Sequence, residues 1–194
     1  MTTTTTSTTI NTPAGYIVGT WAIDPAHSDV SFTVKHMMVS KVRGRFAAFE
    51  GQLVTAEDPL QSSVTATIDT ASIDTNQAQR DAHIRSADFF EVETHPTMTY
   101  RSTGIRADGE DFLVDGELTL KGVTRPVTLT LELGGFGPDA FGGIRAGFSA
   151  STTINRRDFG VDISMPLDGG GVVVGDKITI NLEIEAVLAT PEAA

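Results

Sequence analysis

The segment Lys177-Ile-Thr-Ile-Asn-Leu-Glu-Ile-Glu-Ala186 alternates strictly between polar and apolar side chains. Successive side chains of a β-strand point to opposite faces, so every second residue, Ile180 and Leu182 among them, would lie on one face. Such a strand has one dry face and one wet face, which is typical of an antiparallel sheet that covers a core on one side. We therefore expect an antiparallel β-protein.

The same alternation recurs through the rest of the chain. It is clear in residues 30–35, 112–118 and 127–133, and weaker in residues 42–53, 63–69, 97–103 and 144–154. With the C-terminal segment these give about eight strands. Phe46 and Phe49 are three residues apart and break the alternation, which predicts a bulge or bend between them.

One segment has the composition of a helix instead. Asp74 or Thr75 can cap a run, residues 76–86, that is rich in good helix formers. Phe89 and Phe90 follow it and are too apolar to leave in water. We expect these two rings to close part of the fold or to dock the helix.

Half-buried antiparallel strands in this number can hide their edges and inner faces in a sandwich or in a closed barrel. The periodicity favours neither. An eight-stranded barrel has room inside for side chains or for one ligand of modest size, so a barrel would carry a functional implication.

The chain has 194 residues, enough for one domain with a sizeable core. Residues 1–18 are rich in threonine and offer little apolar surface, so we expect a disordered tail there. The domain would span residues 19–189, and residues 190–194 would form a short tail. The leader lacks the basic start and the apolar stretch of a secretory signal, which predicts a cytoplasmic protein.

Composition and charge exclude several classes of site. Cysteine is absent, so disulfides, thiol nucleophiles and thiolate metal sites are excluded. A formal net charge of -11 repels phosphate backbones and anionic lipid headgroups, which counts against nucleic-acid binding and a membrane-surface role. No segment approaches membrane-spanning length, so we expect no stable membrane insertion.

Catalytic and metal-binding residues are hard to find in this sequence. The residues suited to acid–base catalysis at neutral pH are four histidines, His27, His36, His83 and His95. Their spacing matches no metal-binding motif, so we expect no metal site and no cofactor. Ser28 follows His27 directly, and strand neighbours point to opposite faces, so these two cannot act as a catalytic pair. We therefore expect no enzyme activity.

Arginines in two segments are candidates for binding a polar head group. Arg156 and Arg157 precede Asp158, and Arg80 and Arg85 lie in the expected helix. A guanidinium can bind an anion or form surface ion pairs, and the sequence leaves both alternatives open.

Nine fragments, in this order along the chain, resemble the YceI family of polyisoprenoid-binding proteins. They are Trp21 to Ser28, Val30 to His36, Val42 to Phe46, Ile73 to Asn76 with Arg80 and Asp81, Asp88 to Phe90, His95 with Pro96, Leu118 to Thr124, Arg157 to Gly160 and Gly175 to Glu183. The resemblance implies a lipocalin-like fold: a single eight-stranded antiparallel barrel with one short helix and a hydrophobic tunnel for an isoprenoid chain. Many relatives resemble exported periplasmic proteins, whereas the leader here lacks an apolar core.

Some residues fall, by their place in the alternation, on the inner face of the expected strands, which we call inward parity. These residues, together with the apolar Phe89, are predicted to line the cavity. They are Phe32, Val34, His36, Phe46, Phe89, Tyr100, Phe112, Val114, Leu129, Phe148, Ile180 and Leu182. Arg80 and Arg157 are the predicted head-group contacts, and His36 is a further candidate.

Three hypotheses for function follow. In the first, the barrel binds, carries or sequesters a long apolar amphiphile, such as a polyisoprenoid or an isoprenoid quinone. In the second, it is an enzyme acting on an isoprenoid or acyl substrate, with His36 and a carboxylate such as Asp69 or Asp176 as acid and base. In the third, it is a scaffold that acts through protein contacts, for instance as a homodimer built on an exposed sheet face.

Overall fold

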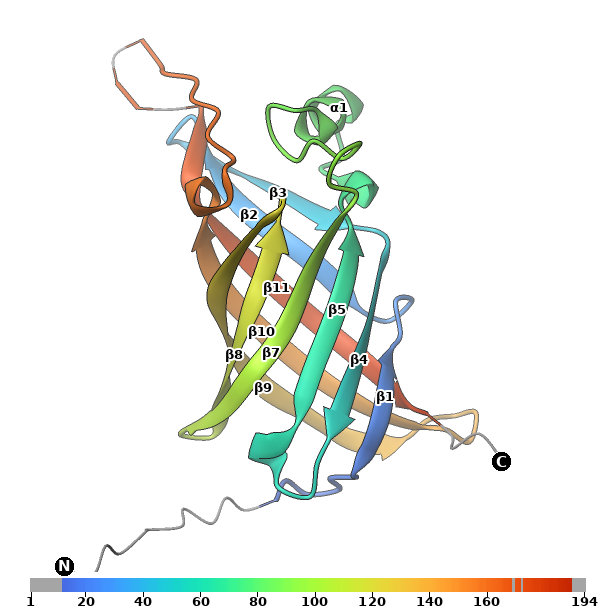
Figure 1. Cartoon of the computed structure of the whole chain (residues 1–194). Helices are drawn as coiled ribbons and strands as arrows, with labels where there is room; N and C mark the ends of the chain where they lie inside the picture. Colours follow the sequence, from blue (N-terminus) through green and yellow to red (C-terminus); the bar gives the residue numbers. More distant parts are fainter. Residues whose placement is uncertain (1–11, 169, 172, 190–194) are drawn as a thin grey trace, which may run out of the picture.

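The computed structural model describes residues 12–168, 170–171 and 173–189. Within them one antiparallel sheet contains all the strands (Figure 1). The strands are β1 (Gly19–Ile23), β2 (Asp29–His36), β3 (Ser40–Phe46), β4 (Phe49–Thr55), β5 (Ser63–Asp69), β6 (Ile73–Asp74), β7 (Thr97–Asp108), β8 (Asp111–Leu120), β9 (Val123–Pro138), β10 (Ile144–Asn155) and β11 (Val174–Leu188). The helices are α1 (Ala78–Arg85) and the 3-10 helices η1 (Pro59–Gln61), η2 (Thr70–Ser72) and η3 (Arg156–Phe159).

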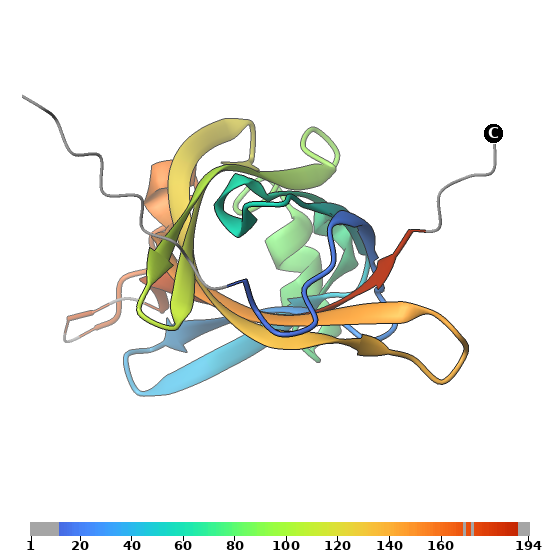
Figure 2. The ribbon, with the colours of Figure 1, turned by 90° about the horizontal axis from the view of Figure 1, so that it is seen from below.

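Eight of these strands close into a barrel. The order is β1-β4-β5-β7-β8-β9-β10-β11, and β1 pairs again with β11 to complete the ring. The view along the axis shows the closed wall (Figure 2). The prediction of an all-β, eight-stranded antiparallel barrel with one short α-helix is confirmed.

The long strand β11 joins this ring to an extension of the wall. Its end, at Leu188, pairs with β1, whereas its first part, from Val174 to Glu183, pairs with β2. Strand β3 pairs with β2, and β6 pairs with the end of β3. The bend predicted between Phe46 and Phe49 is confirmed, because β3 ends at the first ring and β4 begins at the second.

At two positions a glycine of the wall lies directly against a large aromatic ring on the inner face. A Cβ at Gly44 would lie 2.5 Å from the Phe32 ring, and one at Gly116 would lie 2.4 Å from the Tyr100 ring. The Tyr100 hydroxyl donates to the carbonyl of Val114 at 2.9 Å, which satisfies its polar atom inside the wall. Glycine at these two strand positions therefore makes room for the aromatic rings that shape the interior.

One end of the barrel, the lower end in Figure 1, is closed by residues 12–18, which pass beneath it (Figure 2). The Tyr16 hydroxyl donates to the Ala56 carbonyl at 2.8 Å, and its ring meets Phe136 edge-on at 5.3 Å. We expected a disordered tail up to residue 18, and for residues 12–18 this was wrong. Ile17 packs against the cluster around Trp21, and Tyr16 bonds to Ala56. The threonine-rich composition of this segment does not indicate these contacts. Residues 1–11 and 190–194 lie outside the described residues.

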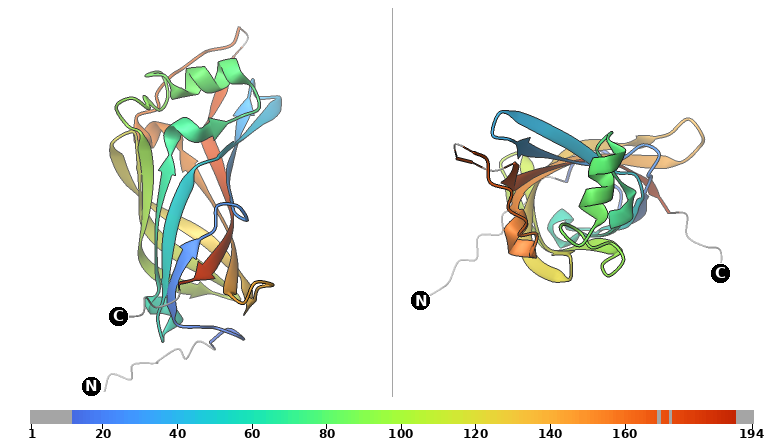
Figure 3. Two further views of the ribbon diagram at one scale, coloured as in Figure 1. Left: turned by 90° about the vertical axis from the view of Figure 1, so that its right-hand side faces the viewer. Right: turned by 90° about the horizontal axis from the view of Figure 1, so that it is seen from above.

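Helix α1 lies across the other end, the upper end of the barrel (Figure 3). It is shorter than the predicted run of residues 76–86, and its N-cap is Gln77, not Asp74 or Thr75. Thr75 instead donates its backbone N–H to the buried carboxylate of Asp81 at 3.0 Å. In the described part of the chain, no helix is long and apolar enough to cross a membrane.

Candidate functional site

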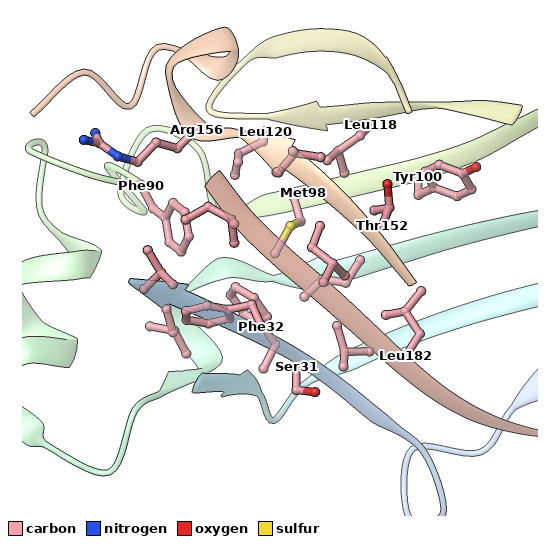
Figure 4. Close-up of a pocket in the computed structure, with 18 of the residues that line it drawn as sticks. Ser31, Phe32, Phe90, Met98, Tyr100, Leu118, Leu120, Thr152, Arg156 and Leu182 are labelled. Atoms are coloured by element: carbon pink, nitrogen blue, oxygen red, sulfur yellow. The ribbon is translucent and has the colours of Figure 1, made fainter. Parts of the chain in front are cut away.

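A cavity of about 730 Å³ occupies the interior of the barrel (Figure 4) and extends to α1, whose residues Gln79, Arg80, His83 and Ile84 help to line it. Its wall is mostly aliphatic and aromatic, because every strand of the ring turns its apolar face inward. Charged, histidine and amide side chains lie near the α1 end. They are Lys35, His36, Gln77, Gln79, Arg80, His83 and Arg156. The cavity thus has an apolar body and a polar end beside α1, which we call the mouth.

The predicted lining residues lie on this wall with one exception. Those on the wall are Phe32, Val34, His36, Phe46, Phe89, Tyr100, Val114, Leu129, Phe148, Ile180 and Leu182. Phe112 is the exception: it lines a separate pocket of about 80 Å³ beside Tyr16 and Phe136 at the lower end. The alternation puts Phe112 on the inner face, but it is the second residue of β8 and lies level with Tyr16, where residues 12–18 close the barrel. Parity gives the face of a strand, not the height along the barrel.

Aromatic rings line the cavity beneath α1. Phe46 lies between Phe32, at 5.9 Å, and Phe90, at 6.0 Å between ring centroids. Phe89 meets the His83 ring edge-on at 5.1 Å. The expectation that Phe89 and Phe90 close the barrel or dock the helix fits this arrangement, since both rings lie on the cavity wall.

The two arginines predicted as head-group contacts differ in position. Arg80 lines the mouth, but its Nε and Nη2 donate to Thr75 Oγ1 at 2.7 Å and to the Thr75 carbonyl at 2.8 Å. Arg157 does not line the cavity, and its Nε lies 2.9 Å from the Asp176 carboxylate. Arg157 therefore lies in a surface ion pair outside the cavity, and its role as a head-group contact stays a prediction.

Arg156, and not its neighbour Arg157, lines the cavity together with Arg80. Its side chain is buried and donates to the carbonyls of Val161 at 2.6 Å and Gly175 at 3.1 Å, and to Asp176 at 2.9 Å. Burial lowers the pKa of Arg156 from its ordinary value, yet a guanidinium stays protonated at neutral pH. The structure thus places a buried guanidinium at the mouth, ion-paired with Asp176.

The sequence contained a signal that Arg156, and not Arg157, faces the cavity. The inward parity of β10 runs through Ala150, Thr152 and Ile154, and its next member is Arg156, not Arg157. The strand predicted from the sequence, residues 144–154, stops before Arg156, whereas β10 extends to Asn155.

The histidines do not form the catalytic pair considered above. His36 lies on the cavity wall, and among the described residues its ring has no hydrogen bond to Asp69 or Asp176. Asp69 accepts from the Ala71 N–H at 2.8 Å, and Asp176 is paired with arginines. Both carboxylates therefore have structural partners instead of the histidine.

His83, on the rim of the mouth, is paired with a carboxylate. Its Nε2 lies 2.8 Å from Asp88 Oδ2, and both side chains are about half exposed. The pair faces solvent as well as the cavity.

A cluster of possible metal ligands lies outside the cavity, where Asp24, His27 and Glu185 place their ligand atoms within 4.8 Å of one another. Arg145 sits among them and donates to Asp24 at 2.7 Å and to Glu185 at 2.5 Å. The hydrogen bond from Arg145, followed by that from His27, lowers the pKa of Asp24 to about 2. The guanidinium already pairs with these carboxylates and with Asp139, so the cluster is an ion-pair network.

We therefore predict that EDTA leaves the protein unchanged. Melting temperature and retained lipid, measured before and after prolonged chelation, should agree within error, because Arg145 occupies the position a cation would need. A large fall in melting temperature that added Zn²⁺ or Ca²⁺ restores would show that this cluster binds metal.

Comparison with known proteins gives consistent matches. Residues 21–186 match the YceI-like domain. "Protein YceI" of Escherichia coli is 44% identical over 136 residues, which cover 70% of this chain and 71% of that protein. A UPF0312 protein of Pseudomonas aeruginosa is 44% identical over 140 residues, covering 72% and 73%.

Solved structures share the fold. BcnA of Burkholderia cenocepacia is 27% identical with a TM-score of 0.73, covering 87% of this chain and 99% of that one. A polyisoprenoid binding domain from Saccharophagus degradans is 18% identical with a TM-score of 0.64, covering 89% and 100%.

Proposed function

The chain belongs to the YceI-like family, and from that premise we propose that it binds and carries a long apolar amphiphile of the isoprenoid class inside the barrel. The observation that carries the proposal is the apolar cavity of about 730 Å³ with its polar mouth. Such a cavity suits a ligand with an apolar chain and a polar head. The polyisoprenoid binding domain from Saccharophagus degradans, which has the same fold, supports the choice of ligand class.

The cavity volume limits the ligand. Ligand cavities in proteins usually measure about 300–1,000 Å³. At about 730 Å³ this cavity lies in the upper part of that range, so it has room for a large part of a long apolar chain.

The polar groups at the mouth orient the ligand. Arg156 supplies a buried guanidinium that is ion-paired with Asp176, and His36 and His83 supply ring nitrogens near the same end. The opposite end is closed by the aromatic cluster of Trp21, Phe136 and Phe148. We expect the chain to point toward that cluster and the head group to lie at the mouth, where an anionic or hydrogen-bonding head finds partners.

The energetics favour exchange over irreversible capture. Burying a methylene from water contributes about 0.8 kcal/mol, so a chain taken from water gains several kcal/mol even after its entropy loss. A lipid that already lies in a bilayer gains almost nothing from moving into another apolar environment. The protein is thus suited to transport or buffering.

The test is to identify what the purified protein retains. Native mass spectrometry followed by organic extraction should recover an apolar chain compound at near one mole per mole of protein. Ala150→Trp, which adds a large ring on the cavity wall, should lower the amount retained at least about fivefold, since the ring takes ligand space.

Ser151→Trp is the matched control, because the neighbouring residue is exposed and faces outward. It should retain the wild-type amount. Equal retention by both variants, with both folded, would mean that the lipid binds outside the cavity.

An enzyme acting on an isoprenoid or acyl substrate is the alternative that one observation favours, the His83–Asp88 pair at 2.8 Å beside the mouth. Neither the family nor the fold is that of a known enzyme. If the carrier proposal holds, a prenyl or acyl ester incubated with the protein should be recovered unchanged. Product that forms with wild type but not with His83→Ala would establish catalysis instead.

A further inference from the structure

The turn between β2 and β3 exposes three apolar side chains in a row. Met37, Met38 and Val39 are 45%, 53% and 87% exposed. Large apolar side chains exposed side by side mark an interaction surface more often than single ones do. We call these three residues the hairpin tip.

The backbone of the hairpin tip is strained. Met37 and Met38 have φ angles of +49° and +60°, and the Val39 N–H donates to the His36 carbonyl at 3.2 Å. The strands pair His36 with Ser40, so residues 37–39 form the loop. Two successive residues with positive φ are disfavoured for side chains with a Cβ, and turns that need them favour Asn and Gly. The sequence thus keeps two methionines against the local preference, as is common where a segment has a function.

The hairpin is also basic within an acidic protein. Residues 29–46 contain Lys35, Lys41, Arg43 and Arg45 but a single acid, Asp29, in a chain of net charge -11. Lys35 and Lys41 are directly opposite each other across the strand pair, an arrangement that like charges make unfavourable. In the part of the chain that the structure describes, Lys35, Lys41 and Arg43 form no ion pair. Basic residues can protect the free edge of β3 from pairing, but this role does not explain the exposed apolar tip.

The hairpin tip adjoins the mouth of the cavity. The Met37 N–H donates to the Val173 carbonyl at 2.8 Å, and Val173 lines the cavity wall. Met38 lies next to Gly171 in the same loop. Strands β2 and β3 reach the end of the barrel that carries α1 (Figure 1).

We propose that the hairpin tip docks reversibly on an anionic membrane surface and so places the mouth of the cavity against the bilayer. Apolar side chains enter the boundary between headgroups and acyl chains, while the lysines and arginines behind them meet lipid phosphates. The acidic remainder of the molecule is repelled by the same surface, which fixes the orientation and keeps the contact weak. This goes beyond the proposed function: it assigns a second surface, and a different partner, to the protein.

The test is flotation of the full-length protein with vesicles of phosphatidylcholine alone or mixed with phosphatidylglycerol. Wild type should bind the mixed vesicles at low ionic strength, and 0.5 M salt or omission of phosphatidylglycerol should reduce binding strongly. Met37→Asn/Met38→Gly, which introduces the residues this turn prefers, should weaken binding about tenfold without loss of melting temperature. Phe141→Ser is the matched control, because this ring is 92% exposed and belongs to the turn between β9 and β10, which lies at the end of the barrel opposite α1 (Figure 1).

The charges are tested separately. Lys41→Gln/Arg43→Gln should weaken binding to the mixed vesicles at least about tenfold. Arg101→Gln/Arg106→Gln removes two exposed cations of β7 that are paired with Glu117 and Asp115, and should change binding little. The proposal is overturned if wild type fails to bind the mixed vesicles, or if the control variants lose as much binding as the hairpin variants. Lipid retained by each variant is measured in the same samples, so a failure of docking is distinguished from a failure of ligand binding.

Discussion

Val114→Lys and Leu129→Lys should each lower the lipid retained per mole of folded protein at least about tenfold. Val114 is 2% exposed and Leu129 8%, and the two are opposite each other in the pairing of β8 with β9. Both side chains line the cavity. An ammonium at either position would face apolar surface, where desolvation is costly unless the amine loses its proton or draws water into the cavity. A hydrated cavity no longer offers the dry interior on which chain binding depends.

Thr128→Lys is the matched control for this prediction. Thr128 is next to Leu129 but exposed on the outer face, and its hydroxyl donates to Asp115 at 2.7 Å. The hydrogen bond from Arg106, followed by that from Thr128, lowers the pKa of Asp115 to about 2, so this carboxylate is charged at neutral pH. A lysine here gains an opposite charge across the strand pair.

Retained lipid is measured on monodisperse protein, with melting temperature as the check on folding. The inward variants should melt at a lower temperature yet remain folded, because the cavity already has room for water. Loss of lipid from Thr128→Lys, with retention by Leu129→Lys, would show that the ligand lies outside the barrel.

The alternation of side chains was enough to predict which residues face inward. It placed Phe32, Val114 and Ile180 on the inner face, and the structure puts them on the cavity wall. Alternation describes each strand by itself, however, and does not state which strands are neighbours. Closure depends on the pairing of Trp21 with Leu188, residues at opposite ends of the chain. The family resemblance, not the periodicity, supplied the barrel.

The sequence did not predict features that depend on the position of a residue along the barrel axis or on the chain beyond the end of a strand. Phe112 has inward parity but lies below the cavity, and Arg156 instead of Arg157 reaches it because the alternation continues one step beyond β10. Residues 12–18 close the lower end through contacts that involve distant segments such as Ala56. The cytoplasmic location, the homodimer and the absence of nucleic-acid binding stay predictions.

Strand β1, which the periodicity did not predict, carries the residue whose loss should destabilise the fold most. Trp21 is 0% exposed and packs on Phe136, at 5.5 Å between ring centroids, and on Ala186. Its indole N–H donates to Thr55 Oγ1 at 2.8 Å, and that hydroxyl donates in turn to the Ile17 carbonyl at 2.7 Å. One side chain therefore joins β1, β4, β11 and the segment that closes the lower end.

Trp21→Ala should lower the free energy of unfolding by about 3–5 kcal/mol, the usual cost of removing a buried aromatic side chain. For a chain of this size that corresponds to a fall in melting temperature of about 10 °C. Trp21→Phe keeps a ring but not the N–H donor, so its melting temperature should lie between those of Trp21→Ala and wild type. Phe141→Ala removes a ring that is 92% exposed and should change the free energy of unfolding by no more than about 0.5 kcal/mol. Thermal and urea unfolding of the three variants measure these differences, and a Trp21→Ala protein as stable as Phe141→Ala would mean that the barrel does not close through β1 and β11.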